Sequence, residues 1–364
     1  MISNGLPPDP TLQLSSLPVI HIAPYLTDND KHGRLSTSAA LHAACREFGF
    51  FYLDLTGFAT PEETEELARL AREFFALPSE EKNKVHLRLQ DNARGYQRLK
   101  ENVTNGKADN HEGIDFYKPV QNPDKTKPLW GENQWPSVPE FREKYEKWVE
   151  KMKELGLVVM EAMAVGLGMT PEEWEELKGN VDDSFWVLRV IGYPPLPNDY
   201  DGFSCGAHKD YGCLTFLWAD DTKGALQVFL QQPGLIVKRP VSYGGVIDEA
   251  VEQGTWINAD PIKGCVVCNI GEMWEIWSNG LYKSTLHRVV HRGINYRIPF
   301  FFEPNFEAVI KPLDAALRMQ AEDADFLHHS EGNIVKPNYE PIRYGEFLKK
   351  KVGSNFEIGK GKYD

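Results

Sequence analysis

The sequence predicts a mainly β protein with added helices, in which the second half of the chain forms a sandwich or jelly roll. Two observations lead to this prediction. From residue 184 onward, short β-branched or aromatic runs alternate with Gly, Pro, Asn and Asp. In addition, the chain lacks the regular alternation of strands and helices that a doubly wound parallel sheet requires.

The N-terminal part mixes strands and helices. Residues 1–16 are rich in Pro and Ser, and we expect them to be mobile. Within an N-terminal region 17–138, we predict a strand over Val19–Ile22, a helix over 36–48 and a strand over Phe50–Leu53.

Two helix starts follow, at Thr60-Pro61 and at Pro78, each with acidic residues in the first turn. Residues 90–138 show little periodicity, which predicts a long ordered loop region. Residues 139–181 are predicted as helical support, with a long amphipathic helix over 139–168 and a second helix starting at Pro171.

Residues 182–314 form the predicted jelly-roll core, with an insertion at 233–254 that is either a surface loop or a lid. Residues 315–364 are predicted as a helical tail. The predicted strands of the core are Phe185–Ile191, Leu214–Trp218, Leu226–Leu230, Thr255–Ala259, Cys265–Ile270, Arg288–His291 and Arg297–Phe302.

Composition narrows the classes of partner. The 364 residues are 41% hydrophobic, enough for a large core. Asp plus Glu (53) exceed Lys plus Arg (40), for a net charge of −13, which argues against nucleic acid and anionic membrane as partners. Five cysteines without a secretory signal fit a cytoplasmic protein. The sequence makes no prediction of oligomeric state.

The first candidate site is His208-Lys-Asp210. Residues two apart in a strand project to the same side, so both side chains can face one metal ion. A third ligand, His287, would come from a partner strand. Two imidazoles and one carboxylate on one face suit Fe(II) and leave positions open for substrate and O2. Taken alone the triplet is weak, since a surface His near an acid is common.

The wider context is more specific. The run Gly206-Ala-His-Lys-Asp-Tyr-Gly-Cys-Leu-Thr215, the run Ser278–Val290, Tyr296-Arg297 and the closing Phe302-Glu-Pro-Asn-Phe306 occur in this order. Together they resemble the Fe(II)/2-oxoglutarate-dependent dioxygenase superfamily, in its isopenicillin N synthase-like branch, over nearly the whole chain. The resemblance implies a double-stranded β-helix (jelly roll) core with an N-terminal α/β region and supporting helices.

The same resemblance implies that His208, Asp210 and His287 bind iron and that 2-oxoglutarate chelates it. Arg297, ten residues after His287, matches the arginine that binds the far carboxylate of the cosubstrate, and an arginine fork suits that group. Tyr193 matches a position that often hydrogen-bonds the cosubstrate. O2 is the second cosubstrate, and ascorbate should help in vitro.

The sequence departs from the family pattern after Arg297. The family reads Arg-x-Ser, but this chain has Pro299 there, which lacks the hydroxyl that would bond the cosubstrate. Counting back from Glu303 gives an alternative register with two residues missing, which puts Asn295 in place of the arginine. The two registers differ by two residues, so Asn295, Arg297 and Pro299 share one strand face in either register.

Two other motifs have simpler explanations. His291 shares a strand face with His287 and is a rival ligand, but a solvated or neighbouring His is favoured. Cys265 and Cys268 lie three apart in a predicted strand with no second pair, so we expect ordinary thiols rather than a zinc or redox site.

The predicted substrate pocket contains polar and aromatic side chains near the metal motif. Arg189 shares a strand face with Tyr193 and has no obvious acidic neighbour, so we expect it to bind a carboxylate of a small polar substrate. The alternative for Arg189 is a structural role. The other predicted pocket residues are Arg98, Asn102, Tyr211 and Phe301.

The function predicted by the resemblance is Fe(II)- and 2-oxoglutarate-dependent oxidation of a small molecule by hydroxylation, desaturation or cyclisation, with release of succinate and CO2. Two alternatives are a same-fold Fe(II) oxidase that does not use 2-oxoglutarate and a non-catalytic binding protein with a relict fold. An ethylene-forming relative is a weaker variant, because Asn102 stands where that type carries an acid.

Overall fold

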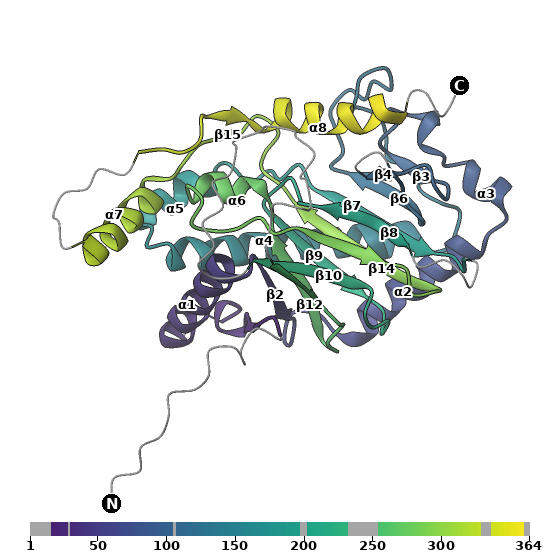
Figure 1. The fold of residues 1–364 in the computed structure, drawn as a ribbon. Coiled ribbons are helices and arrows are strands. Elements are labelled where there is room, and N and C mark those ends of the chain that lie inside the picture. Colours follow the sequence, from purple (N-terminus) through teal and green to yellow (C-terminus); the bar gives the residue numbers. More distant parts are fainter. Residues whose placement is uncertain are drawn as a thin grey trace, which may run out of the picture.

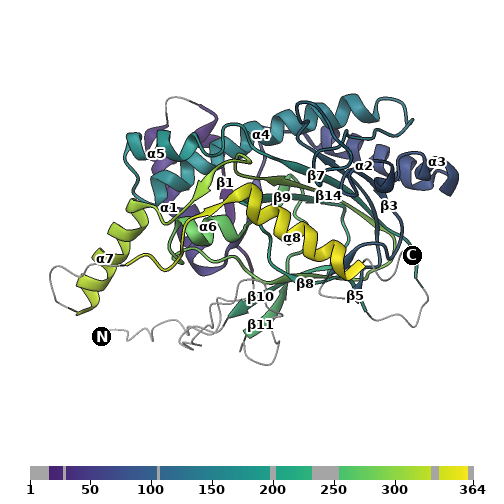
Figure 2. The ribbon, with the colours of Figure 1, turned by 90° about the horizontal axis from the view of Figure 1, so that it is seen from above.

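The computed structural model describes residues 16–27, 30–104, 107–196, 202–231, 254–328 and 336–359. Two β-sheets lie face to face, and helices cover the outer face of the larger one (Figures 1 and 2). The larger sheet has the strand order β1 (Val19–His21), β2 (Phe50–Asp54), β12 (Cys265–Ile270), β9 (Leu214–Ala219), β14 (Asn295–Phe302), β7 (Val187–Tyr193), β6 (Glu112–Tyr117) and β3 (Gly95–Gln97).

The smaller sheet and the helices complete the predicted architecture of a jelly-roll core with an N-terminal α/β region and supporting helices. The smaller sheet has the order β11 (Gly254–Asn258), β10 (Leu226–Gln231), β13 (His287–Val290) and β8 (Phe203–His208). The helices are α1 (Lys31–Glu47), α2 (Pro61–Ala76), α3 (Ser79–Asn83), α4 (Phe141–Gly166), α5 (Pro171–Lys178), α6 (Glu272–Trp277), α7 (Asp314–His328) and α8 (Tyr344–Gly359).

Short elements fill the connections: the 3-10 turns η2 (Ala23–Tyr25) and η3 (Leu87–Leu89), and two small pairs formed by β4 (Val103–Thr104) with β5 (Lys107–Ala108) and β15 (Val309–Ile310) with β16 (Ile342–Arg343). None of the helices in the described part of the chain is long and apolar enough to cross a membrane.

Helix α4 determines which face of the larger sheet points inward. It packs on β14 at Gly156, where an added Cβ would lie 2.2 Å from the ring of Phe302. Phe300 and Phe302 are buried on this helix-covered side. Because side chains alternate along a strand, Arg297 and Phe301 of β14 project to the opposite side, toward the smaller sheet.

Local sequence signals explain where the helices begin. At Thr60 the side chain accepts from the Glu63 backbone N–H, and the Glu63 carboxylate accepts from the Thr60 backbone N–H. This capping box confirms the helix start predicted at Thr60-Pro61. Helix α1 starts earlier than residue 36, because the Asp30 side chain caps it by accepting from the Gly33 N–H at 2.8 Å.

The prediction of a long loop over 90–138 is partly wrong. Strand β6 pairs with β7 from Glu112↔Gly192 to Tyr117↔Val187, and β3 pairs with β6 at the edge of the larger sheet. The segments predicted as a mobile N-terminus and as the 233–254 insertion lie almost entirely outside the described residues.

Candidate metal centre

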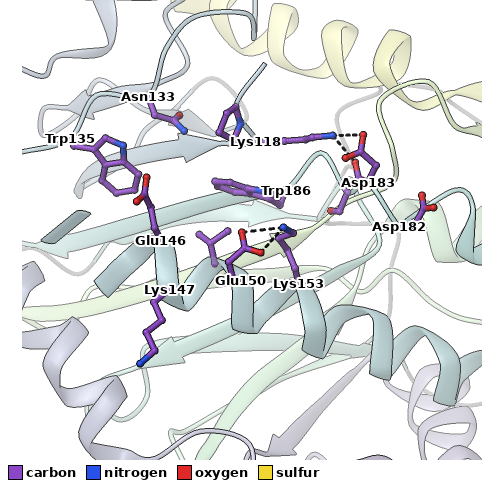
Figure 3. Close-up of a pocket in the computed structure, with 13 residues that line it drawn as sticks. Lys118, Asn133, Trp135, Glu146, Lys147, Glu150, Lys153, Asp182, Asp183 and Trp186 are labelled. Atoms are coloured by element: carbon purple, nitrogen blue, oxygen red, sulfur yellow. Dashed lines mark hydrogen bonds and ion pairs between the residues drawn. The ribbon is translucent and has the colours of Figure 1, made fainter. Parts of the chain in front are cut away.

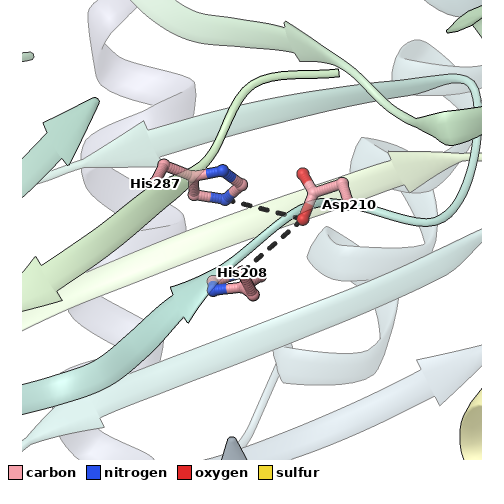
Figure 4. Close-up of side chains that lie close together, drawn as sticks. All are labelled: His208, Asp210 and His287. Atoms are coloured by element: carbon pink, nitrogen blue, oxygen red, sulfur yellow. Dashed lines mark ion pairs between the residues drawn. The ribbon is translucent and has the colours of Figure 1, made fainter. Parts of the chain in front are cut away.

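The three predicted metal ligands meet between the two sheets. His208 ends β8 and His287 begins β13, and the antiparallel pairing of these strands places the two residues directly opposite each other. Asp210 follows β8 two residues later. Its Oδ1 lies 3.7 Å from His208 Nε2 and 3.6 Å from His287 Nε2 (Figure 4). One ligand atom from each side chain lies within 4.8 Å of the other two.

Backbone carbonyl groups orient both imidazoles. His208 Nδ1 lies 2.8 Å from the Gly206 carbonyl oxygen, and His287 Nδ1 lies 3.1 Å from that of Thr285. A carbonyl can only accept, so each Nδ1 carries the proton and donates it. The Nε2 lone pairs are therefore free to face a metal ion next to Asp210, which is the usual arrangement of metal-binding histidines.

Asp210 is held by two further donors. Its Oδ2 accepts from Thr215 Oγ1 at 2.5 Å and from Asn269 Nδ2 at 2.7 Å. Burial would raise the pKa of Asp210, but the imidazoles of His287 and His208 and these hydrogen bonds lower it. Burial, together with His208, lowers the pKa of His287 to about 4. The carboxylate is thus ionised and the His287 ring neutral, the forms that coordinate iron.

Arg297 is a buried cation without an anionic partner among the residues that the structure describes. Its side chain is 3% exposed, and its guanidinium lies 5.7 Å from the ring centre of Tyr193. Among the described residues it has no ion pair, and its buried Nε has no hydrogen-bond partner. An unpaired guanidinium in the interior is costly unless a ligand supplies the anion. The far carboxylate of 2-oxoglutarate fits this requirement, with Tyr193 beside it.

Pro299 interrupts the ladder of β14 on one side only. Pairing with β9 continues through Pro299↔Leu217, whereas pairing with β7 runs from Asn295↔Tyr193 to Arg297↔Ile191 and resumes at Phe300↔Leu188. Proline has no N–H to donate, which explains the gap. Asn295 and Arg297 both face inward, as either register requires, and the Asn295 amide donates to the Gly293 carbonyl at 2.8 Å.

The expectation that Arg189 has no acidic partner is wrong. Its Nε donates to Asp115 Oδ1 at 2.8 Å, and its Nη2 lies 3.5 Å from Gln97 Oε1. Asp115 lies directly opposite Arg189 in the β6–β7 pair. Arg189 therefore has the structural role that the sequence left open: it joins β7 to β6 through Asp115.

The other predicted pocket residues are spread more widely. Asn102 donates to Asp109 Oδ2 at 2.6 Å, and Asp109 Oδ1 accepts from the Gly206 N–H, close to His208. Tyr211 lies under helix α8, with Lys351 Nζ 5.0 Å from its ring centre.

The last two predicted pocket residues, Phe301 and Arg98, differ in how deeply their side chains are buried. Phe301 is partly buried opposite Thr215. Arg98 lies at the surface instead, with its side chain 54% exposed and its Nε donating to Asn83 at 2.9 Å. The placement of Arg98 argues against the predicted pocket role.

Sequence reasoning missed several buried polar residues near the site, namely Asp109, His111, Asp115 and Asn269. Three of them lie in the stretch predicted as a loop. The alternation of apolar Ile114 and Phe116 with Gly113 and Asp115 is a strand signal that could have revealed β6.

The rival motifs do not join the metal site. His291 Nδ1 lies 3.0 Å from Ser204 Oγ, and His291 is not among the side chains that converge on Asp210. All five cysteines are free thiols, Cys265 and Cys268 included. Neither Cys265 nor Cys268 belongs to the group of described side chains that could hold a metal ion.

A cavity of about 540 Å³ lies elsewhere in the molecule (Figure 3). It is lined by Trp135, Trp186 and side chains of α4, and so opens on the helix-covered side of the larger sheet. Its lining includes two ion pairs, Lys118 with Asp183 and Lys153 with Glu150. The sheet separates this cavity from the metal ligands.

Comparisons with known proteins agree with this geometry. Residues 17–138 match the family described as non-haem dioxygenase in morphine synthesis N-terminal, and residues 183–304 match the 2OG-Fe(II) oxygenase superfamily. The chain belongs to the 2OG-Fe(II) oxygenase superfamily. This enzyme is therefore a non-haem iron dioxygenase that uses Fe(II) and 2-oxoglutarate and acts on a small molecule.

Relatives of this dioxygenase cover almost the whole chain. A homoarginine-6-hydroxylase of Glycine max is 38% identical over 94% of this chain and 98% of its own, and one of Oryza sativa subsp. japonica is 36% identical over the same shares. Among solved structures, a 2OG-Fe(II) oxygenase family protein from Caulobacter crescentus has a TM-score of 0.71 at 25% identity, covering 93% of this chain and 99% of its own.

Proposed function

We propose that this dioxygenase hydroxylates a small amino acid with a basic side chain, of the homoarginine type. The observation that carries the proposal is the likeness to homoarginine-6-hydroxylases, which extends at 36–38% identity over 94% of the chain. Relatives this similar over their full length commonly share a reaction type, whereas the fold alone would leave the substrate open.

The geometry supports the proposed roles in the iron centre. His208, Asp210 and His287 would hold Fe(II), and Arg297 with Tyr193 would bind the far carboxylate of 2-oxoglutarate. When bound, iron and 2-oxoglutarate together activate O2 for oxidation of a C–H bond, with release of succinate and CO2. The protein orients the reactants and excludes water from a site enclosed between two sheets.

The charges around the centre support a substrate with both a carboxylate and a cation. Arg189 uses Nε for Asp115 and Nη2 for Gln97, so its remaining N–H groups can donate to a substrate carboxylate. Asp109 is buried beside Gly206, two residues before His208, and offers a carboxylate to an ammonium or guanidinium group.

The test measures succinate formed from 2-oxoglutarate under Fe(II), ascorbate and O2. Homoarginine, arginine and lysine are compared with citrulline, which has a neutral end group in place of the guanidinium. We expect the basic amino acids to increase succinate release and citrulline to do so far less. Slow succinate release that no basic amino acid increases would leave the dioxygenase intact but overturn the proposed substrate class.

We also propose a cytoplasmic location. The unpaired state of all five cysteines supports it, because thiols persist in a reducing compartment.

A further inference from the structure

The carboxylate of Glu275 contacts both chain segments that carry the metal ligands. Lys209 lies between His208 and Asp210, directly after the end of β8. Its Nζ lies 3.6 Å from Glu275 Oε2 on helix α6. The same oxygen accepts the backbone N–H of Ser284 at 3.1 Å, three residues before His287.

The Ser284 contact bears directly on the His287 ring. The next residue, Thr285, provides the carbonyl that accepts from His287 Nδ1, and its hydroxyl donates to the Phe48 carbonyl at 2.7 Å. A shift of the chain at Ser284 would therefore move the group that orients this imidazole. Metal centres lose affinity when their ligands are held less closely in place.

The surroundings make the Glu275 contacts strong. The side chain of Glu275 is 13% exposed and that of Lys209 19%, so solvent screens the ion pair only partly. The Tyr339 hydroxyl donates to the other carboxylate oxygen, Oε1, at 3.4 Å. The Glu275 carboxylate thus contacts three separate segments within the described part of the chain.

We propose that Glu275 is a positioning residue of the iron centre, which fixes the His208–Asp210 segment relative to the His287 segment through Lys209 and Ser284. The inference deepens the proposed function, because it assumes that these three residues bind Fe(II). Glu275 itself does not contact the metal. Its role is to set the distance between ligands that come from strands far apart in the sequence.

The primary test is the affinity for Fe(II), measured by anaerobic calorimetry without substrate. Glu275→Ala removes all three contacts, and we expect it to weaken Fe(II) binding by about 10- to 100-fold, the usual effect of losing a group that supports metal ligands. Glu275→Gln keeps the shape and one acceptor oxygen, so its affinity should lie between those of Glu275→Ala and the wild type. Unchanged affinity in Glu275→Ala would overturn the proposal.

Lys209→Met separates positioning from simple charge effects. If Glu275 acted only as a negative charge near the cation, removing the positive Lys209 would strengthen Fe(II) binding. If the Glu275–Lys209 contact positions the ligands, the same change weakens Fe(II) binding. We expect weaker binding, and stronger binding would overturn the proposal.

Glu112→Gln is the matched control for general loss of stability. Glu112 is also a largely buried carboxylate with a lysine partner, Lys82 at 2.7 Å, and a tyrosine partner, Tyr96 at 2.5 Å, but it contacts neither ligand segment. We expect Glu112→Gln to lower the melting temperature. Its Fe(II) affinity should stay within about twofold of that of the wild type, as expected for a change far from the metal ligands. Failure of the wild type to bind Fe(II) would instead refute the metal site itself.

Discussion

Asn269 and Thr215 face each other across strands β12 and β9, and both donate to the oxygen of Asp210 that points away from the two histidines. Asn269→Ala would leave the carboxylate freer to rotate. We expect Fe(II) affinity to fall by about 10- to 100-fold, measured by anaerobic titration. Asn305→Ala, which removes an amide from a surface cluster with Asp182, is the control and should leave the affinity unchanged.

Arg297 gives a second prediction at the residue scale. Arg297→Ala should raise the KM for 2-oxoglutarate at least tenfold, since loss of a charge-assisted hydrogen bond costs about 1.5–3 kcal/mol. Asn295→Ala should change this KM little, because its amide is bonded to the Gly293 carbonyl. A larger effect of Asn295→Ala than of Arg297→Ala would select the alternative register and contradict our assignment.

Single residues also show why the site could be predicted only in part. His208 and Asp210 are two apart, a spacing that predicts one side of a strand. The two side chains do meet, although β8 ends at His208. The partner of Arg189 is Asp115, far upstream in a strand that the sequence did not reveal. Long-range pairs of this kind depend on the order of strands in the sheet, which local sequence patterns do not encode.

At the scale of elements, the long helices and the buried strands could be predicted from the sequence, whereas the short elements could not. The apolar stripe of α4 and the β-branched run of β12 give clear periodicity. Helix α6 has six residues, too few to show a helical period, and its aromatic side chains equally suit a strand. Yet α6 carries Glu275, so a short unpredicted element supports the predicted ligands.

Helix α8 gives a prediction of its own. It crosses the paired sheets (Figure 2). Its Lys351 lies 5.0 Å from the ring centre of Tyr211, the residue after Asp210. Leu348 is a buried side chain of α8, so Leu348→Ala should lower the free energy of unfolding by about 2–5 kcal/mol in urea titration. Val352→Ala is the matched control, and its effect should be smaller because Val352 is only partly buried. Equal losses for both variants would show that α8 is not docked through Leu348.

For the whole molecule, one buried carboxyl group links stability to pH. Glu303 accepts from the Tyr344 hydroxyl at 2.8 Å, and burial raises its pKa to about 8. The folded protein therefore keeps this proton over a range where the unfolded chain has lost it. Because the folded state binds more protons there, this group's contribution to stability falls as pH rises from about 4.5 to about 8.

Glu303→Gln removes the ionisation but keeps a hydrogen-bond acceptor for Tyr344. We expect the free energy of unfolding of Glu303→Gln, relative to the wild type, to improve steadily between about pH 5 and pH 8. Glu173→Gln is the control, because Arg318 lowers the pKa of Glu173 and its ionisation lies below this range. Parallel curves for Glu303→Gln and the wild type would contradict the prediction.

The pairing of His208 with His287 also has a consequence for how the protein folds. The two histidines face each other across neighbouring strands, although a large part of the core lies between them in the sequence. Closing so long a loop is entropically costly and slow, so the complete ligand set forms only after β8 and β13 have met. The rate at which a refolding chain gains Fe(II) affinity therefore measures the formation of this non-local contact, and the metal is a kinetic reporter of the chain's topology.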